Sequence, residues 1–151
     1  MEQDEELKQK ALEFLKRNIL AVVSTVTSDG KPNAATVLYH VDDDLNFYFV
    51  TRKSSRKFEN LAANNNVAIV VGVGGEPRTI QMEGQAQQSE GVLAKFMENL
   101  GKLGDLEKLY FGPFLHIPGL DFTIFRVRID WLRIVDVGEE LKMEEYFRVV
   151  G

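Results

Sequence analysis

The feature of this sequence that most constrains its fold is a series of short, strand-like apolar runs separated by turn residues. The runs are rich in β-branched and aromatic residues and are too short for independent helices, which favours strands. Tight turns such as Ser28-Asp29-Gly30 join the first three runs, as expected of an antiparallel meander. We predict strands over residues 19–26, 34–41, 45–51, 67–71, 78–88 and 122–136, the last of them bent or divided near Asp130.

Helical spacing of apolar residues appears at intervals between these runs. It predicts one helix over residues 4–18, a second over 55–64 and a third over 89–100. The second helix is expected to bury Phe58, Leu61 and Ala62 and to end at residues 64–66, where asparagine tolerates the left-handed conformation. Residues 102–121 are apolar enough to cover a core edge or a subunit contact, and residues 146–150 would add an edge strand or cross to a partner chain.

The strand order indicates the fold class. A meander with few helices, without a regular β-α-β alternation, favours an α+β protein built on an antiparallel six-stranded barrel with flanking helices. The 151 residues are enough for one hydrophobic core, so we expect a single domain over residues 1–151.

Composition excludes several classes of function. The chain has no cysteine, which excludes disulfides, thiolate zinc sites and a cysteine nucleophile. It has no apolar run long enough for a membrane span, and its acidic start argues against a targeting peptide, so a cytoplasmic protein is expected. A net charge of -5 argues against nucleic-acid binding.

The segment between the third strand and the second helix carries four cations within six residues: Arg52, Lys53, Arg56 and Lys57. Ser54 or Ser55 is a suitable N-cap for the helix, which would place two of the cations in its first turn. Positive charge is unfavourable at that end of the helix dipole, so we interpret the segment as a binding site for an anion, most simply a phosphate. A solvated basic loop is an equally weighted alternative on charge alone.

The sequence contains no catalytic acid–base motif, so no catalytic residue is assigned. The two histidines, His40 and His116, are far apart in sequence, and we interpret both as structural. The alternatives are a contact between His40 and a bound ligand or a substrate, and a place for His116 in the lining of the pocket. The aspartates at 42–44 lack the spacing of a calcium loop and indicate a hairpin turn, so no metal site is predicted.

Several short motifs occur together in an order that is known from one family. Over roughly residues 5–137 the chain resembles the pyridoxamine 5′-phosphate oxidase-like, FMN-binding split-barrel proteins. The motifs that carry the resemblance are Ser24-Thr25 to Asp29-Gly30-Lys31-Pro32, Phe49-Val50-Thr51, Ser55-Arg56-Lys57, Asn60-Leu61, Val67-Ala68-Ile69-Val70 and Gln81-Met82-Glu83-Gly84-Gln85-Ala86.

The resemblance implies a homodimer that binds FMN at the subunit interface. In the family, one strand runs along the isoalloxazine ring, a strand end and a helix start hold the ribityl chain and phosphate, and a later strand commonly comes from the other subunit. The implied cofactor-binding residues are Ala35, Thr36 and Val37 beside the ring, Val50, Thr51, Ser55, Arg56 and Lys57 at the ribityl chain and phosphate, and Thr79 and Gln81 on the later strand. The phosphate position agrees with the anion site derived from the charges.

The sequence also departs from the true pyridoxamine 5′-phosphate oxidases. Ala35 stands where those enzymes have a basic residue, His40 stands where they have a lysine, and their C-terminal arginine and histidine pattern is absent. The resemblance is therefore to the wider family and not to the vitamin B6 oxidase itself.

The leading functional hypothesis is an FMN-dependent oxidoreductase acting on an unidentified small molecule. In such a protein the flavin supplies the redox chemistry and the polypeptide supplies position and electrostatics, so a catalytic motif is not required. Two alternatives stay open: a reductase that uses a deazaflavin coenzyme on the same fold, and a non-catalytic flavin- or haem-binding module for storage, sensing or electron carriage.

Overall fold

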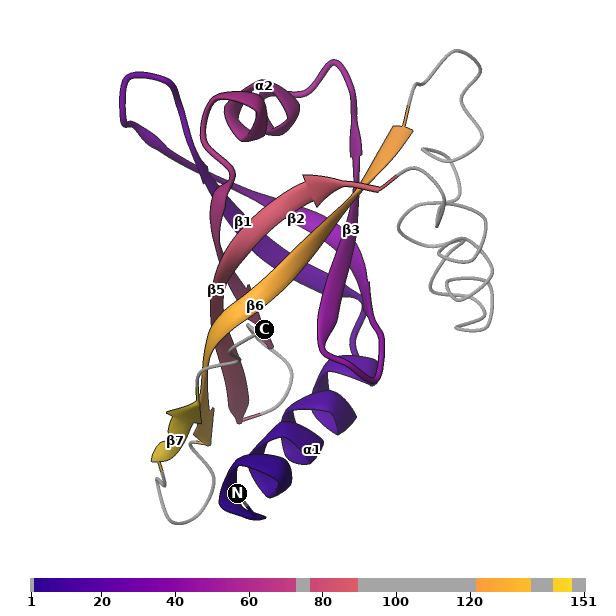
Figure 1. The fold of residues 1–151 in the computed structure, drawn as a ribbon, viewed down its shortest axis with the longest axis vertical. Helices are drawn as coiled ribbons and strands as arrows, with labels where there is room; N and C mark the ends of the chain where they lie inside the picture. The colour runs from indigo at the N-terminus through magenta and orange to yellow at the C-terminus, as the bar shows by residue number, and fades with distance from the viewer. Residues whose placement is uncertain (1, 73–76, 90–121, 137–142, 148–151) are drawn as a thin grey trace.

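A computed structural model of the chain describes residues 2–72, 77–89, 122–136 and 143–147. Two helices and seven strands lie within these ranges (Figure 1). In chain order they are α1 Glu2–Lys16, β1 Leu20–Val26, β2 Pro32–Val41, β3 Asn46–Arg52, α2 Arg56–Ala63, β4 Asn66–Val71, β5 Arg78–Gln88, β6 Phe122–Asp136 and β7 Met143–Phe147.

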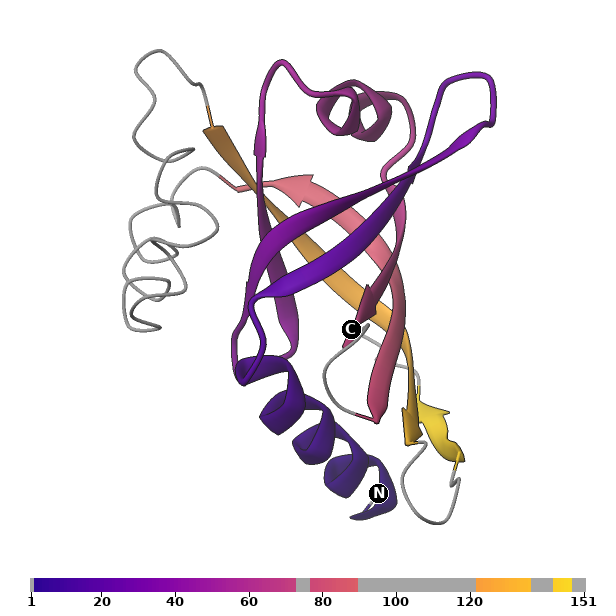
Figure 2. The same cartoon turned by 180° about the vertical axis from the view of Figure 1, so that it is seen from behind.

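The strands form one antiparallel sheet that closes on itself. Their order is β3-β2-β1-β4-β5-β6-β7, and β3 also pairs with β6, which closes a barrel of six strands with β7 at the edge of β6 (Figures 1 and 2). The helices lie at opposite ends of this barrel, α1 at one end and α2 at the other (Figures 1 and 2). The predicted α+β fold, an antiparallel six-stranded split barrel with flanking helices, is confirmed.

Strand β6 is the longest strand of the barrel, with 15 residues. Its register with β5 shifts so that Glu83 pairs with Trp131 and Gly84 with Ile129, which leaves Asp130 as an extra residue. This is a β-bulge, which bends a strand, and it explains the predicted bend near Asp130.

Glycine is required on the other side of this bulge. A Cβ atom on Gly84 would lie 2.2 Å from the carbonyl oxygen of Arg128, so no larger residue fits without moving the backbone.

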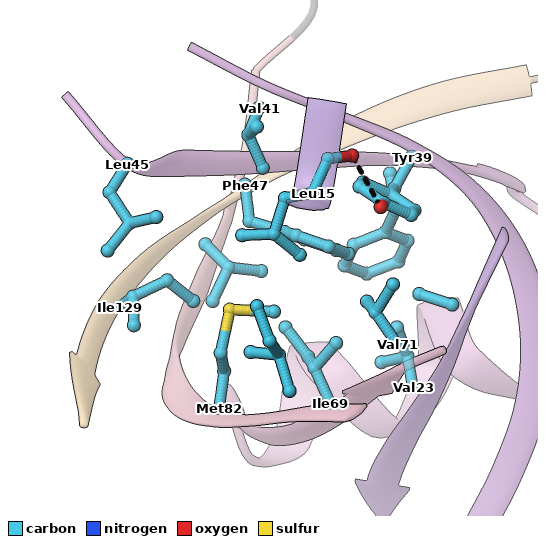
Figure 3. Packing of buried hydrophobic residues seen from close by; sticks show 14 of the residues in the cluster. Leu15, Val23, Tyr39, Val41, Leu45, Phe47, Ile69, Val71, Met82 and Ile129 are labelled. Carbon is cyan, nitrogen blue, oxygen red and sulfur yellow. Dashed lines mark hydrogen bonds between the residues drawn. The ribbon is translucent and has the colours of Figure 1, made fainter. Parts of the chain in front are cut away.

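The core fills the barrel and is sealed at one end by α1. Phe14 and Leu15 of α1 are fully buried among the inward side chains of the strands, and Tyr39 stacks on Phe47 with ring centroids 4.9 Å apart. The hydroxyl of Tyr39 donates a 2.6 Å hydrogen bond to the carbonyl oxygen of Leu15, which joins the end of α1 to β2 (Figure 3). A smaller cluster formed by Leu38, Val50 and Ile124 lies apart from this core.

The turn at residues 42–44 has the predicted role. A carboxylate oxygen of Asp42 accepts hydrogen bonds from the backbone N–H groups of Asp44 and Asn46, at 3.0 Å and 2.9 Å. Aspartate in this position replaces backbone partners in a tight turn, which accounts for the hairpin between β2 and β3.

Two details of α2 and one of β7 differ from the sequence-based expectation. Asn60 and Leu61 are its buried residues, whereas Ala62 is exposed. The helix ends at Ala63, and its C-cap, Asn64, has an extended conformation, with φ at −150°, and not a left-handed one. The edge strand β7 begins at Met143, earlier than the predicted 146–150. The predicted helix over 89–100, the segment 102–121 and His116 lie outside the described residues.

Candidate functional site

The junction between β3 and α2 is built around two hydroxyl groups. Ser55 is the N-cap of α2, with φ at −81° and ψ at 159°, and its Oγ accepts a 3.2 Å hydrogen bond from the backbone N–H of Phe58. The Oγ1 of Thr51, at the end of β3, lies 2.9 Å from the Oγ of Ser55. The prediction of an N-cap at residue 54 or 55 is therefore confirmed for Ser55. The cap satisfies one of the four free N–H groups of the first turn and leaves others available to a ligand.

Three cations of this junction have no carboxylate partner in the described part of the chain. Arg52 and Arg56 are exposed and Lys57 is half-buried, and none of them forms an ion pair there. Burial, and secondarily the positive charge of Arg52, lowers the pKa of the Lys57 ammonium group. The junction thus concentrates uncompensated positive charge at the positive end of a helix dipole, where a bound anion would be stabilised.

A cluster of amides ties α2 to the barrel directly beneath these cations. Asn60 is buried, and its Nδ2 donates to the Oγ1 of Thr25 on β1, at 2.9 Å, and to the Oδ1 of Asn33 on β2, at 3.0 Å. The same Oδ1 of Asn33 accepts a 2.9 Å hydrogen bond from the Nη2 of Arg56. These contacts hold the start of α2 against the end of β1 and the beginning of β2.

Sequence reasoning missed Asn33 and gave Asn60 no role in the site. The signal available for Asn60 was an amide at a helix position next to the buried Leu61, where an apolar residue would be ordinary. Asn33 follows a turn and a proline, where asparagine is common, so no signal in the sequence distinguished it.

The structure brings part of the predicted cofactor site together. Thr51, Ser55, Arg56 and Lys57 share the β3–α2 junction, and the bond from Arg56 to Asn33 places the beginning of β2 beside them. On β2, Ala35 is half-buried, Thr36 is exposed and Val37 is buried, and this alternation places Ala35 and Val37 on one face and Thr36 on the other. Val50 is buried in the small cluster with Leu38 and Ile124.

Thr79 and Gln81 are not near the junction within one chain. Both lie half-exposed on β5, which is separated from β2 by β1 and β4. Thr36, Val22, Val70 and Gln81 form one row across these four strands. Three interstrand steps of about 4.8 Å separate Thr36 from Gln81 along the sheet. On its other side Gln81 pairs with Arg133 of β6, whereas Thr51 of the junction pairs with Thr123, ten residues or about 33 Å along the same strand.

A hollow of about 650 Å³ adjoins the other end of α2. Its lining is entirely uncharged, so it offers apolar and amide contacts but no group that would donate or remove a proton. The lining residues are Phe58, Leu61, Ala62, Ala63, Asn64, Asn65, Asn66, Ala86, Gln88 and Phe125.

The structure gives His40 a packing contact. Its ring stacks on that of Tyr48, with centroids 5.4 Å apart. Within the described ranges, no three His, Cys, Asp or Glu side chains gather as they would around a metal ion. Neither helix of the described chain has the length and apolar composition needed to cross a membrane.

Comparison with known proteins gives a family match that covers most of the chain. The sequence model of the family "Pyridoxamine 5′-phosphate oxidase" matches residues 7–136. A pyridoxine/pyridoxamine 5′-phosphate oxidase of Rubrobacter xylanophilus is 38% identical over 65 residues, which is 43% of this chain and 30% of that protein. A second such enzyme, from Streptomyces avermitilis, is 45% identical over 49 residues, or 32% of this chain and 22% of that protein. The chain thus aligns with less than a third of either curated relative.

Solved structures with the same fold cover nearly the whole chain. General stress protein 26 of Bacillus anthracis has a TM-score of 0.69 at 23% identity, over 95% of this chain and 98% of that one. An FMN-binding, pyridoxamine 5′-phosphate oxidase-related protein of Nostoc punctiforme has a TM-score of 0.59 at 12% identity, covering 96% and 92%. A heme-binding protein of Mycobacterium smegmatis has a TM-score of 0.69 at 19% identity, covering 93% and 57%. At these identities the likeness establishes the fold alone.

Proposed function

Because the chain belongs to the pyridoxamine 5′-phosphate oxidase-like split-barrel family, we propose that it binds FMN and acts as an oxidoreductase on a small molecule. The observation that carries this proposal is the cationic junction between β3 and α2. FMN presents a phosphate monoester with up to two negative charges, and the junction offers uncompensated cations, hydroxyls and helix N–H groups. The residues present therefore fit the phosphate of the group.

Each side chain of the junction has a distinct part in this proposal. The Arg56 guanidinium donates charge-assisted hydrogen bonds to the phosphate, and the Lys57 ammonium supplies a second charge from a half-buried position. Thr51 and Ser55, whose hydroxyl oxygens lie 2.9 Å apart at the same junction, would contact the ribityl chain where it joins the phosphate. When bound, the flavin supplies the redox chemistry, and the protein positions it and shields it from water.

A second copy of the chain completes the proposed site. Thr79 and Gln81 lie on β5, too far along the sheet to reach the junction of their own chain. In a homodimer with the flavin between the subunits, these two residues would come from the partner. Sedimentation should then give a mass near twice the 17.1 kDa of one chain, whereas a monomer that binds FMN tightly would contradict the shared site.

The second candidate is a haem-binding or flavin-binding module without turnover. It is supported by the fold likeness to the heme-binding protein of M. smegmatis, whose TM-score equals that of general stress protein 26. The visible spectrum of the purified protein separates the candidates, since FMN, haem and deazaflavin absorb differently. Reduction of bound FMN by NADH or NADPH without oxygen, followed by transfer to an acceptor, would favour the oxidoreductase over a passive carrier.

The phosphate contact is tested by the double variant Arg56→Ala with Lys57→Ala. At about 1.5 kcal/mol for each partly exposed charge-assisted contact, the loss is about 3 kcal/mol, or more than a hundredfold in the Kd for FMN. Lys31→Ala is the matched control, because Lys31 is an exposed cation in the β1–β2 turn, where it pairs with Asp29. Equal FMN affinity in the double variant and the control would rule out the junction as the phosphate site.

A further inference from the structure

The side chain that holds Arg56 is neutral, although its place would suit a carboxylate. The Oδ1 of Asn33 accepts hydrogen bonds from the Nη2 of Arg56, at 2.9 Å, and from the Nδ2 of Asn60, at 3.0 Å. Both donors would bond more strongly to an aspartate, which has the same shape as asparagine and a negative charge. An aspartate would also neutralise the guanidinium, whereas the amide orients it and leaves its charge uncompensated.

The orientation of the Asn33 amide is determined by its neighbours. Its Nδ2 donates a 3.0 Å hydrogen bond to the carbonyl oxygen of Pro32, so its oxygen faces the helix. Asn60 uses its two N–H groups on Thr25 and Asn33, and with 7% of its surface exposed it has little access to water. A buried amide whose donors are both used is held in one place, and it therefore fixes the oxygen of Asn33.

The Arg56 guanidinium is therefore oriented by one hydrogen bond, while its other N–H donors are available to a ligand. A guanidinium carries five N–H donors in a planar fork, and the contact with Asn33 uses one of its two terminal nitrogens. The side chain is exposed and has no other hydrogen bond or ion pair in the described part of the chain. A guanidinium that is oriented through one terminal nitrogen can donate hydrogen bonds from its other N–H groups to the oxygens of a phosphate.

We propose that Asn33 is a positioning residue that makes this site select a phosphorylated flavin over its dephosphorylated form, by holding the Arg56 guanidinium without neutralising it. The proposal rests on the proposed FMN site and assigns its selectivity to a residue on β2. Asn60 supports Asn33 from the buried side. Arg56 would contact the phosphate monoester alone, so binding of the rest of the flavin should not depend on Asn33.

The variant Asn33→Asp separates positioning from a purely structural role. It keeps the shape and the acceptor for both hydrogen bonds from α2, so the barrel–helix contact persists. It loses the donor to the carbonyl oxygen of Pro32, a local contact within β2, so a small fall in the Tm of the unliganded protein is expected. The added negative charge pairs with Arg56 and repels the phosphate, so the Kd for FMN should increase about tenfold or more. The Kd for riboflavin, which lacks the phosphate, should stay within about twofold of the wild type, and the loss for FMN should shrink at high salt.

Asn65→Asp is the matched control, because it changes the net charge equally at an exposed residue that touches neither Asn33 nor the junction. Parallel losses for FMN and riboflavin in Asn33→Asp would overturn the proposal, as would unchanged FMN affinity. If the wild type binds FMN no better than riboflavin, the selectivity itself is absent and the proposal falls while flavin binding stands. If the wild type binds neither, the proposed function fails first.

Discussion

Replacing Tyr39 with phenylalanine tests how α1 is fastened to the barrel. Tyr39 is 1% exposed, and its hydroxyl donates the 2.6 Å hydrogen bond to the carbonyl oxygen of Leu15. Without it, that oxygen keeps only the longer, 3.3 Å bond from the N–H of Asn18. Buried neutral hydrogen bonds contribute about 1 kcal/mol, and loss of a good donor costs somewhat more. We expect Tyr39→Phe to lower the free energy of unfolding by about 1.5 kcal/mol and the Tm by about 5 °C.

Tyr48→Phe is the matched control for this substitution. It removes the same atom from a half-exposed ring, whose hydroxyl makes a longer, 3.3 Å contact with Asp42. Solvent replaces that contact, so the expected change is below about 0.5 kcal/mol. Urea unfolding at pH 7 measures both variants, with equal slopes required for a valid comparison. Equal losses in the two variants would refute the argument that the buried bond fastens α1.

The same variant has a signature in alkaline solution. Burial raises the pKa of the Tyr39 phenol well above its ordinary value of 10.0. A group whose pKa is higher in the folded than in the unfolded state stabilises the protein below the unfolded pKa, and this contribution is lost as the pH rises. The stability advantage of the wild type over Tyr39→Phe should therefore shrink above pH 10 by about 1.4 kcal/mol per pH unit and reverse near about pH 11. A constant difference between about pH 8 and 11 would contradict the assigned burial.

Two further substitutions test the bulge and the charge of the junction. Gly84→Ala should destabilise the protein by about 3 kcal/mol, because its Cβ would lie 2.2 Å from the carbonyl oxygen of Arg128. Gly30→Ala, at φ +90° with open space around it, should cost about 1 kcal/mol. Thermal unfolding compares the two variants, and a smaller loss of stability for Gly84→Ala than for Gly30→Ala would refute the close approach. Because the pKa of Lys57 is lowered, its ammonium group loses its proton at a lower pH than a free lysine does. The affinity for FMN should therefore fall as the pH rises and Lys57 deprotonates, by at most tenfold per pH unit. Lys57→Arg keeps its charge and should remove this dependence, and identical profiles for the two proteins in FMN titrations would exclude Lys57 as its source.

The strands were predictable because their apolar pattern follows the geometry of the barrel. Residues at alternate positions face the core, so both ends of the strand at 78–88 could be predicted from its apolar alternation. The same pattern is interrupted near Asp130, which allowed the bend in β6 to be predicted. The capping hydroxyl of Ser55 was predictable because it acts on backbone only three residues away.

The buried face of α2 was not predictable for a related physical reason. Its orientation is set by hydrogen bonds from Asn60 to Thr25 and Asn33, which lie far away in the sequence. In a helix of eight residues these contacts outweigh the apolar periodicity, so Ala62 faces solvent and an amide takes the buried position. Asn33 bonds to residues of α2 that are close to it only after folding, so no local sequence pattern could predict its role.

The position of β6 in the chain has a consequence for how the protein is made. Among the barrel strands β6 is synthesised last, yet it is the one that pairs with both β3 and β5. A nascent chain that has reached only β5 therefore carries two open sheet edges, which other chains can join. Pairing of β3 with β6 spans a long loop and is slow. The amide cluster under α2 joins only β1, β2 and α2, so it can form on the ribosome before β6 is made. The barrel can close around its core only after β6 has been synthesised.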